Sequence, residues 1–171
     1  MRAIAAEVGI RAPSLYKHFP DKAAIETAII ADGLTELGEA LRAGGPGLAG
    51  MAAAYRDFAV SHPHLYTLMT QRPLDRDRLP EGLEGEVARP LLEALGDEHR
   101  ARAAWASAHG LAILELNGRF PPAADLDAAW AALVAAFARS AGSAHAANAG
   151  EPLSPNADRT SKLSFSVPSR Q

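Results

Sequence analysis

Helical periodicity is the feature that most constrains how this chain folds. Apolar residues recur at three- and four-residue spacing through most of the chain before Gly142, and Ala, Leu and Glu are abundant. No window shows the sustained alternation of apolar and polar residues, rich in β-branched side chains, that marks a strand. We therefore predict an all-α protein.

Glycine and proline residues set the ends of the first two predicted helices. A short helix over residues 2–8 is followed by Gly9, because glycine takes the positive φ that often follows a helix. Pro13 suits the first position of a second helix over 13–19, where its missing N–H costs nothing, and Pro20 ends that helix. Two helices of about two turns each, joined by a tight turn, are thus expected at the start of the chain.

Six further helices are predicted beyond Pro20. They are expected over residues 22–43, 48–61, 63–70, 83–95, 97–117 and 125–141. Asp21 is positioned to cap the first of them, and Pro90 is expected to kink or split the helix that contains it. The last two carry most of the apolar surface, with Trp105 among the residues expected to face the core.

Changes in composition divide the chain into three parts. Residues 1–43 form a helix-turn-helix region with a connecting helix, which the sequence "GGPG" ends. Residues 48–141 form a larger helical domain. In residues 142–171 the Ser, Ala, Asn and Pro content rises and periodicity disappears, which predicts a disordered tail.

Composition excludes several classes of protein. The 171 residues include no cysteine, which excludes a disulfide-stapled fold and a thiolate zinc site. No apolar stretch reaches the roughly 18 residues of a membrane span and no signal peptide is recognisable, so we expect a cytoplasmic protein without membrane contact. The net charge is -3, yet residues 1–22 carry a net charge of +2, so positive charge gathers at the opening stretch.

Two short helices joined by a glycine-containing turn are typical of the helix-turn-helix unit. In that unit the second helix enters the major groove of DNA. The side chains expected to face outward here are Arg11, Ala12, Pro13, Ser14, Tyr16, Lys17 and His18, with Lys22 just beyond. Basic and hydroxyl side chains of this kind bind phosphates, and small apolar groups contact thymine methyls. A plain helical hairpin with a solvated face remains the alternative on spacing alone.

The residues themselves resemble a known family. The stretch "MRAIAAEVGIRAPSLYKHFPDKAAI" closely resembles the DNA-binding region of TetR (AcrR-like) bacterial transcriptional regulators, whose recognition helix carries a Leu-Tyr-x-His-Phe pattern. The resemblance implies that Ala12, Pro13, Ser14, Tyr16, Lys17 and His18 lie at or near DNA. It also implies that Lys22 contacts a phosphate.

The rest of the chain resembles the C-terminal domain of a TetR subgroup named for a Trp, His-Gly signature, here Trp105, His109 and Gly110. The resemblance implies an all-helical domain that encloses a small effector and dimerises through its last two helices, here 97–117 and 125–141. The residues expected at the effector pocket are Tyr55, Phe58, Tyr66, Met69, Trp105 and His109. The alternative for the aromatic residues and Met69 is plain core packing, and for His109 it is a hydrogen-bonded core histidine.

Other polar residues do not assemble a reaction centre. His62 and His64 flank Pro63 without a nearby carboxylate, so we interpret them as loop residues rather than metal ligands. Glu115 lies six residues after His109 and is turned roughly 240° away from it on a helix, so the two do not form an acid–base couple. We therefore expect no catalytic residues, no metal and no cofactor.

The sequence therefore predicts an effector-responsive transcriptional regulator, a repressor, that binds a near-palindromic operator in double-stranded DNA as a homodimer. TetR-like proteins begin with a further helix ahead of the segment that corresponds to "MRAIA". The alternative is therefore a helical dimerisation or ligand-binding protein that has lost DNA binding through truncation of that helix.

Overall fold

The computed structural model describes residues 1–9 and 11–147, with side chains up to Ala138. Within these residues the structure has eight α-helices, one short 3-10 helix and no strand, which confirms the predicted all-α class. The helices are Arg2–Glu7 (α1), Ala12–His18 (α2), Lys22–Ala43 (α3), Leu48–Ser61 (α4), Pro63–Thr70 (α5), Leu83–Leu95 (α6), Glu98–Leu116 (α7) and Leu126–Ala147 (α8), with the 3-10 helix η1 over Arg76–Arg78.

Each α-helix begins within one residue of its predicted start. Pro90 lies inside α6, and the predicted split is wrong because the helix continues from Leu83 to Leu95. The prediction of a disordered tail is wrong for residues 142–147, which continue α8. The remaining residues of that tail, 148–171, lie outside the described residues.

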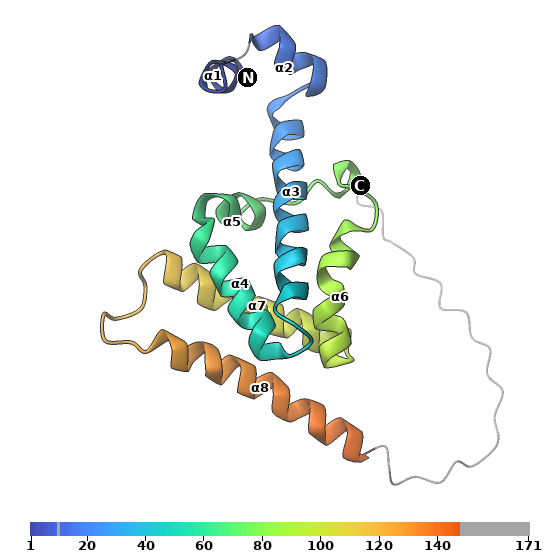
Figure 1. Cartoon of the computed structure of the whole chain (residues 1–171), viewed down its shortest axis with the longest axis vertical. Helices are drawn as coiled ribbons and strands as arrows, with labels where there is room; N and C mark the ends of the chain where they lie inside the picture. Colours follow the sequence, from blue (N-terminus) through green and yellow to red (C-terminus); the bar gives the residue numbers. More distant parts are fainter. Residues whose placement is uncertain (10, 148–171) are drawn as a thin grey trace, which may run out of the picture.

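The long helix α3 is the axis of the molecule (Figure 1). Its C-terminal part packs against α4, α5 and α6. Helices α7 and α8 pack against each other and against α4, at the end of the molecule opposite α1 and α2. The short helices α1 and α2 pack on each other at the N-terminal end of α3, away from α4 to α8. The fold therefore presents two short helices at the tip of a larger helical body.

Local interactions explain where α2 and α3 begin. Gly9 has a φ of 70°, as predicted for the residue that turns the chain after α1. Asp21 caps α3, because its side chain accepts a hydrogen bond from the Ala24 amide at 2.7 Å. Pro13 stands in the first turn of α2, where no amide donor is needed.

The main core lies where α3, α4, α5, α7 and α8 meet. Its buried residues are Leu37, Leu41, Met51, Tyr55, Phe58, Ala59, Tyr66, Ala108, Ala112 and Trp130. A smaller cluster of Leu95, Ala101 and Ala104 fills the space between α6 and α7. Both clusters bury apolar surface that the isolated helices would leave in water.

The expectation that Trp105 faces the core is wrong, because 55% of this residue is exposed. The buried face of α7 consists of Ala101, Ala104, Ala108 and Ala112. Small side chains let neighbouring helices approach α7 closely, whereas an indole would overfill that face. Trp105 therefore lies at the edge of the buried face, a position that helical periodicity alone did not separate from the core.

The turn from α3 to α4 brings two backbones into close contact. A Cβ added to Gly50, in the first turns of α4, would collide with the carbonyl oxygen of Gly44. Gly85, in α6, has nothing within 4 Å of the same position. Both are helical glycines, so they differ in their surroundings rather than in their backbone conformation.

We predict that Gly50→Ala lowers the free energy of unfolding by about 1–3 kcal/mol, because the backbone of the turn must shift to admit the methyl group. Gly85→Ala is the matched control and raises the free energy of unfolding by up to about 1 kcal/mol, as helix propensity alone dictates. Urea unfolding of both variants measures these changes. A stabilised Gly50→Ala variant would show that the close approach is not a constraint.

Candidate nucleic-acid interface

Helix α2 presents polar side chains outward while apolar residues hold it in place. Leu15 is 8% exposed, and Ala5 of α1, the helix that packs against α2, is 1% exposed. Tyr16 is 51% exposed. The other exposed residues of this segment are Arg11, Pro13, Ser14, Lys17 and His18, and Ala12 is half-buried. The structure thus brings most of the predicted set together on α2, with Arg11 just before it, Lys22 at the start of α3 and Ala12 the least accessible member.

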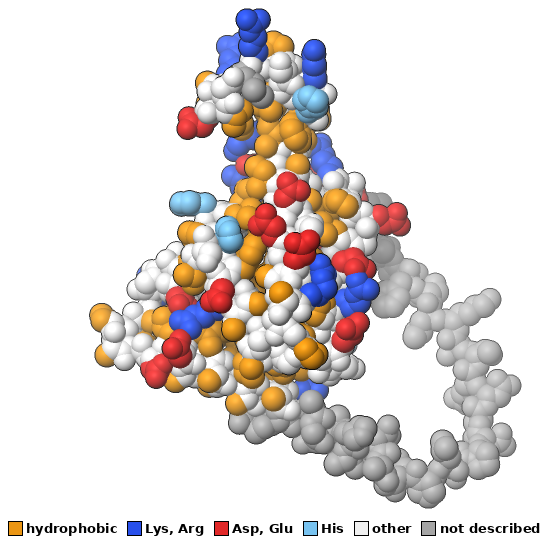
Figure 2. Space-filling view, viewed as in Figure 1, with side chains coloured by type: hydrophobic (Ala, Val, Ile, Leu, Met, Phe, Trp, Pro, Cys, Tyr) orange, Lys and Arg blue, Asp and Glu red, His pale blue; other side chains and the backbone are white. Residues whose placement is uncertain are grey.

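Positive charge is concentrated around this helix. Figure 2 shows lysine and arginine side chains at the tip formed by α1 and α2, with an acidic side chain beside them, whereas acidic and basic side chains are mixed over the body. The exposed basic residues near the tip are Arg2, Arg11, Lys17 and Lys22. A basic tip on a molecule of negative net charge favours approach to a polyanion with the tip leading.

Lys22 lies at the start of α3 and shares an anionic partner with another part of the chain. Its Nζ is 2.9 Å from Glu26 Oε1, and Arg72 Nη1 is 3.1 Å from Glu26 Oε2. Hydrogen bonding to Lys22 is the main cause that lowers the pKa of Glu26; burial opposes it, and the charge of Arg72 adds a lesser lowering effect. Sequence reasoning missed Glu26, although its spacing from Lys22 is that of a helical ion pair.

Five of the six predicted effector residues lie in or beside the core, and the sixth, Trp105, is 55% exposed. Tyr55, Phe58 and Tyr66 are buried, and Met69 and His109 are half-buried. Tyr66 links the set, because its hydroxyl lies 2.7 Å from the Tyr55 hydroxyl and 2.8 Å from His109 Nδ1. Burial raises the pKa values of both tyrosines and lowers that of His109, so all three groups are neutral at pH 7.

We predict that Tyr66→Phe lowers the free energy of unfolding by about 1–3 kcal/mol, because the Tyr55 hydroxyl and His109 Nδ1 both lose a partner in the core. Tyr55→Phe leaves the Tyr66–His109 bond in place and costs less, about 0.5–1.5 kcal/mol. Chemical unfolding measures both values. Equal losses of stability in the two variants would contradict the greater importance of the Tyr66 hydroxyl, which bonds both Tyr55 and His109.

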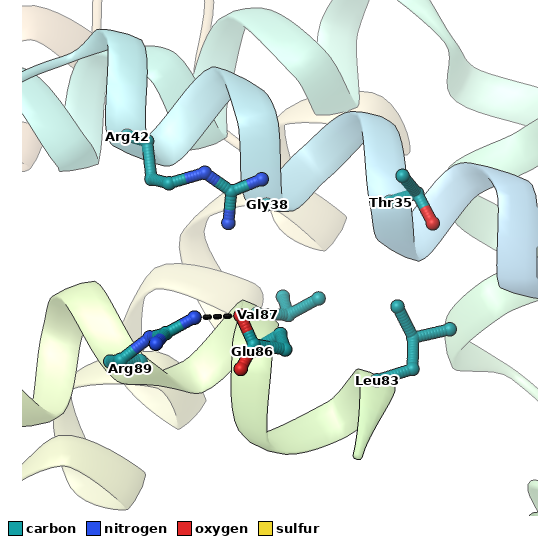
Figure 3. A pocket seen from close by; sticks show the side chains of 7 residues that line it. All are labelled: Thr35, Gly38, Arg42, Leu83, Glu86, Val87 and Arg89. Carbon is teal, nitrogen blue, oxygen red and sulfur yellow. Dashed lines mark ion pairs between the residues drawn. The ribbon is translucent and has the colours of Figure 1, made fainter. Parts of the chain in front are cut away.

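Two surface grooves lie elsewhere on α3. One, of about 320 Å³, separates α3 from α6 and is lined by Thr35, Gly38, Arg42, Leu83, Glu86, Val87 and Arg89 (Figure 3). The other, of about 360 Å³, is lined by Ala24, Thr27, Ala28, Ala31, Asp32, Arg78 and Pro80. Neither set includes any of the six predicted effector residues. Sequence periodicity gave no signal for these grooves, because each joins side chains far apart in the chain.

A polar cluster fastens α4 to α7 and α8. The Arg56 guanidinium binds Glu115 Oε1 at 2.8 Å and also pairs with Asp127, while the Trp130 indole donates to Glu115 Oε2 at 3.1 Å. Burial raises the pKa of Glu115, but the hydrogen bonds from Arg56 and Trp130 outweigh it and leave the pKa below its ordinary value. Glu115 and His109 therefore have different partners, as their helical spacing predicted.

The lowered pKa of Glu115 makes this cluster sensitive to acid. Its contribution to stability is present above the ordinary pKa of 4.5 and is lost as the pH falls through the lower folded value. We predict that Glu115→Gln costs about 1–2 kcal/mol at pH 7 and that the difference from wild type shrinks below pH 4.5. Urea unfolding at several pH values measures this. Glu93→Gln, which makes the same change of charge at an exposed position of α6, is the control and is expected to lower the free energy of unfolding by less at pH 7.

The described residues include neither a cluster of metal ligands nor a helix that could span a membrane. No group of three or more His, Asp or Glu side chains in residues 1–9 and 11–147 is placed to hold a metal ion. The helices in this part of the chain also lack the combination of length and apolar character needed to cross a bilayer. His62 ends α4, and its ring packs on Phe58 at a centroid distance of 5.1 Å.

A helix-turn-helix tip on a helical body defines a class of regulatory protein, and comparison with known families specifies it. Residues 1–29 match the model of bacterial regulatory proteins of the tetR family. Residues 48–137 match the model of the tetracyclin repressor-like C-terminal domain. The chain therefore belongs to the TetR family.

Individual relatives agree with this assignment. An uncharacterized HTH-type transcriptional regulator of Mycobacterium tuberculosis, Rv0681, is 31% identical over 134 residues, which cover 69% of this chain and 61% of that protein. The chain thus spans about three fifths of the length of this relative. The crystal structure of SCO4313, described as a regulatory protein, aligns with a TM-score of 0.64 and 26% identity over 80% of this chain and 83% of that one.

Proposed function

We propose that this chain is a DNA-binding transcriptional regulator whose helix α2 enters the major groove. The observation that carries the proposal is the exposed polar face of α2, a helix that packs on α1 at the tip of the molecule. Family membership supports the same function. The geometry is that of a helix-turn-helix, in which the second helix contacts base edges and the first braces it.

The side chains of this face divide into two groups by their chemistry. Arg11 and Lys17 provide the positive charge that binds phosphates, and Ser14 and Tyr16 add hydroxyl donors. Pro13 and Ala12 offer small apolar surfaces that fit against thymine methyl groups. The phosphate-binding side chains set the affinity for DNA and the position of α2 on it. Pro13 and Ala12, together with His18, contribute to the choice of base sequence.

We propose that the regulator acts as a homodimer through α7 and α8. Leu114 of α7 is 42% exposed and lies on the side of the helix opposite its buried alanines, so α7 carries outward apolar surface that a second copy can cover. A dimer places two copies of α2 in successive major grooves of a near-palindromic operator. Its affinity then depends on both copies binding at once.

The helical domain is proposed to bind a small effector that controls repression. The Tyr55–Tyr66–His109 chain supplies polar groups within an otherwise apolar region, the usual composition of a ligand site. An effector that prefers a dimer with a different α2 spacing shifts the population toward that state and releases DNA.

DNA binding is tested with the full chain and a duplex selected from a random-sequence pool. We predict that Lys17→Ala weakens binding and reduces the magnitude of the salt slope by about one, because one phosphate contact is lost. Tyr16→Phe weakens binding without changing the slope, because the lost donor is uncharged. Fluorescence anisotropy at several salt concentrations measures both.

Arg119→Ala is the matched control, because this exposed arginine lies between α7 and α8, far from the tip. It removes one positive charge and leaves both affinity and slope unchanged. An equal effect of Lys17→Ala and Arg119→Ala would overturn the role of α2. Recovery of a dimer that selects no duplex would instead favour the alternative, a dimerisation or ligand-binding protein without DNA binding.

A further inference from the structure

The tip of the molecule is connected to the helical body through the first turns of α3. Helices α1 and α2 pack mainly on each other, so their position depends on this connection. The segment between α5 and α6 contacts it with two arginines. Arg72 binds Glu26 at 3.1 Å, and Arg78 Nη1 lies 3.2 Å from Asp21, the residue that caps α3.

Glu26 is the shared partner in this contact. It is bound by Lys22 from its own helix and by Arg72 from the segment after α5, so one carboxylate faces two cations. Its side chain is 21% exposed, whereas those of Lys22 and Arg72 are 60% and 61% exposed. The two cations can therefore exchange with solvent or another anion more readily than the carboxylate can.

We propose that Arg72 is a positioning residue that controls how much of the Lys22 charge is available to DNA, by competing for Glu26. This inference rests on the proposed function, in which Lys22 contacts a phosphate. With Arg72 in place the three groups carry a net charge of +1, and Lys22 can turn toward DNA while Glu26 keeps a partner. Without Arg72, Glu26 and Lys22 form a neutral pair.

The position of Arg72 connects this competition to the helical domain. Arg72 lies two residues after Thr70, whose hydroxyl donates to the Tyr66 carbonyl at 2.7 Å in the last turn of α5. Tyr66 is the central residue of the Tyr55–Tyr66–His109 chain. A displacement of α5 would therefore also move Arg72, which follows the end of α5 by two residues and binds Glu26.

The test is a double-mutant cycle on the full chain, with the labelled duplex selected by the wild type. We expect Arg72→Gln to weaken binding about three- to fivefold, because Glu26 then holds Lys22 alone. In the Glu26→Gln background the same substitution has no effect, because no carboxylate remains to compete for. Lys22→Gln likewise removes the effect of Arg72→Gln.

Arg76→Gln is the matched control. Arg76 lies in the same segment and its side chain is 69% exposed, but it pairs with Glu84 at 2.9 Å and forms no hydrogen bond or ion pair with α3 among the described residues. It makes the same change in net charge and leaves DNA affinity unchanged. Equal losses for Arg72→Gln and Arg76→Gln would show a general charge effect and overturn the proposal. A loss that persists in the Glu26→Gln background would overturn it as well, because Arg72 would then bind DNA directly.

A second measurement does not depend on DNA. Acetylation of the Lys22 amine by a small acylating reagent, followed by mass spectrometry, reports how tightly Glu26 holds it. We expect acetylation of Lys22 to slow in Arg72→Gln and to recover in Arg72→Gln/Glu26→Gln, with no change in Arg76→Gln. An unchanged rate in Arg72→Gln overturns the competition. If the wild type binds no duplex, the proposed function fails, and this rate still decides whether Arg72 and Lys22 compete.

Discussion

The packing of α3 against α4, α5 and α6 is the constraint on which the rest of the structure depends. Two glycines make this packing possible, because a side chain at Gly33 would contact Met69 and Leu65, and one at Gly38 would press on Val87. The C-terminal part of α3 is thereby fixed in the helical body while its N-terminal end carries α1 and α2. Any tilt of this one helix moves the candidate recognition helix at its tip.

Polar contacts in the body lie at the junctions between helices. Arg56 and Glu115 join α4 to α7, and the Tyr66–His109 bond joins α5 to α7. Such groups give few alternatives for how the helices can pack, since a shift by one turn would leave them without partners. Polar contacts also join elements at the surface, where Arg72 and Arg78 of the segment after α5 bind Glu26 and Asp21 at the start of α3.

Much of the fold was predictable because its signals are local. The capping of α3 by Asp21, the positive φ of Gly9 and the starts of all the α-helices depend on residues a few positions apart. The outward face of α2 followed from the same periodicity. Trp105 was misplaced, because apolar periodicity identifies a face of α7 but not how closely the neighbouring helices approach it.

The sequence by itself determined the helical class, the starts of the helices and the basic, hydroxyl-bearing surface of α2, because each depends on neighbouring residues. Only the tertiary structure decided which distant side chains meet. The pairing of Glu26 with Arg72, of Glu115 with Arg56 and of Tyr66 with His109 each joins residues more than 40 positions apart. Such contacts leave no periodic trace in the sequence, since they depend on how the helices pack rather than on where each helix begins and ends.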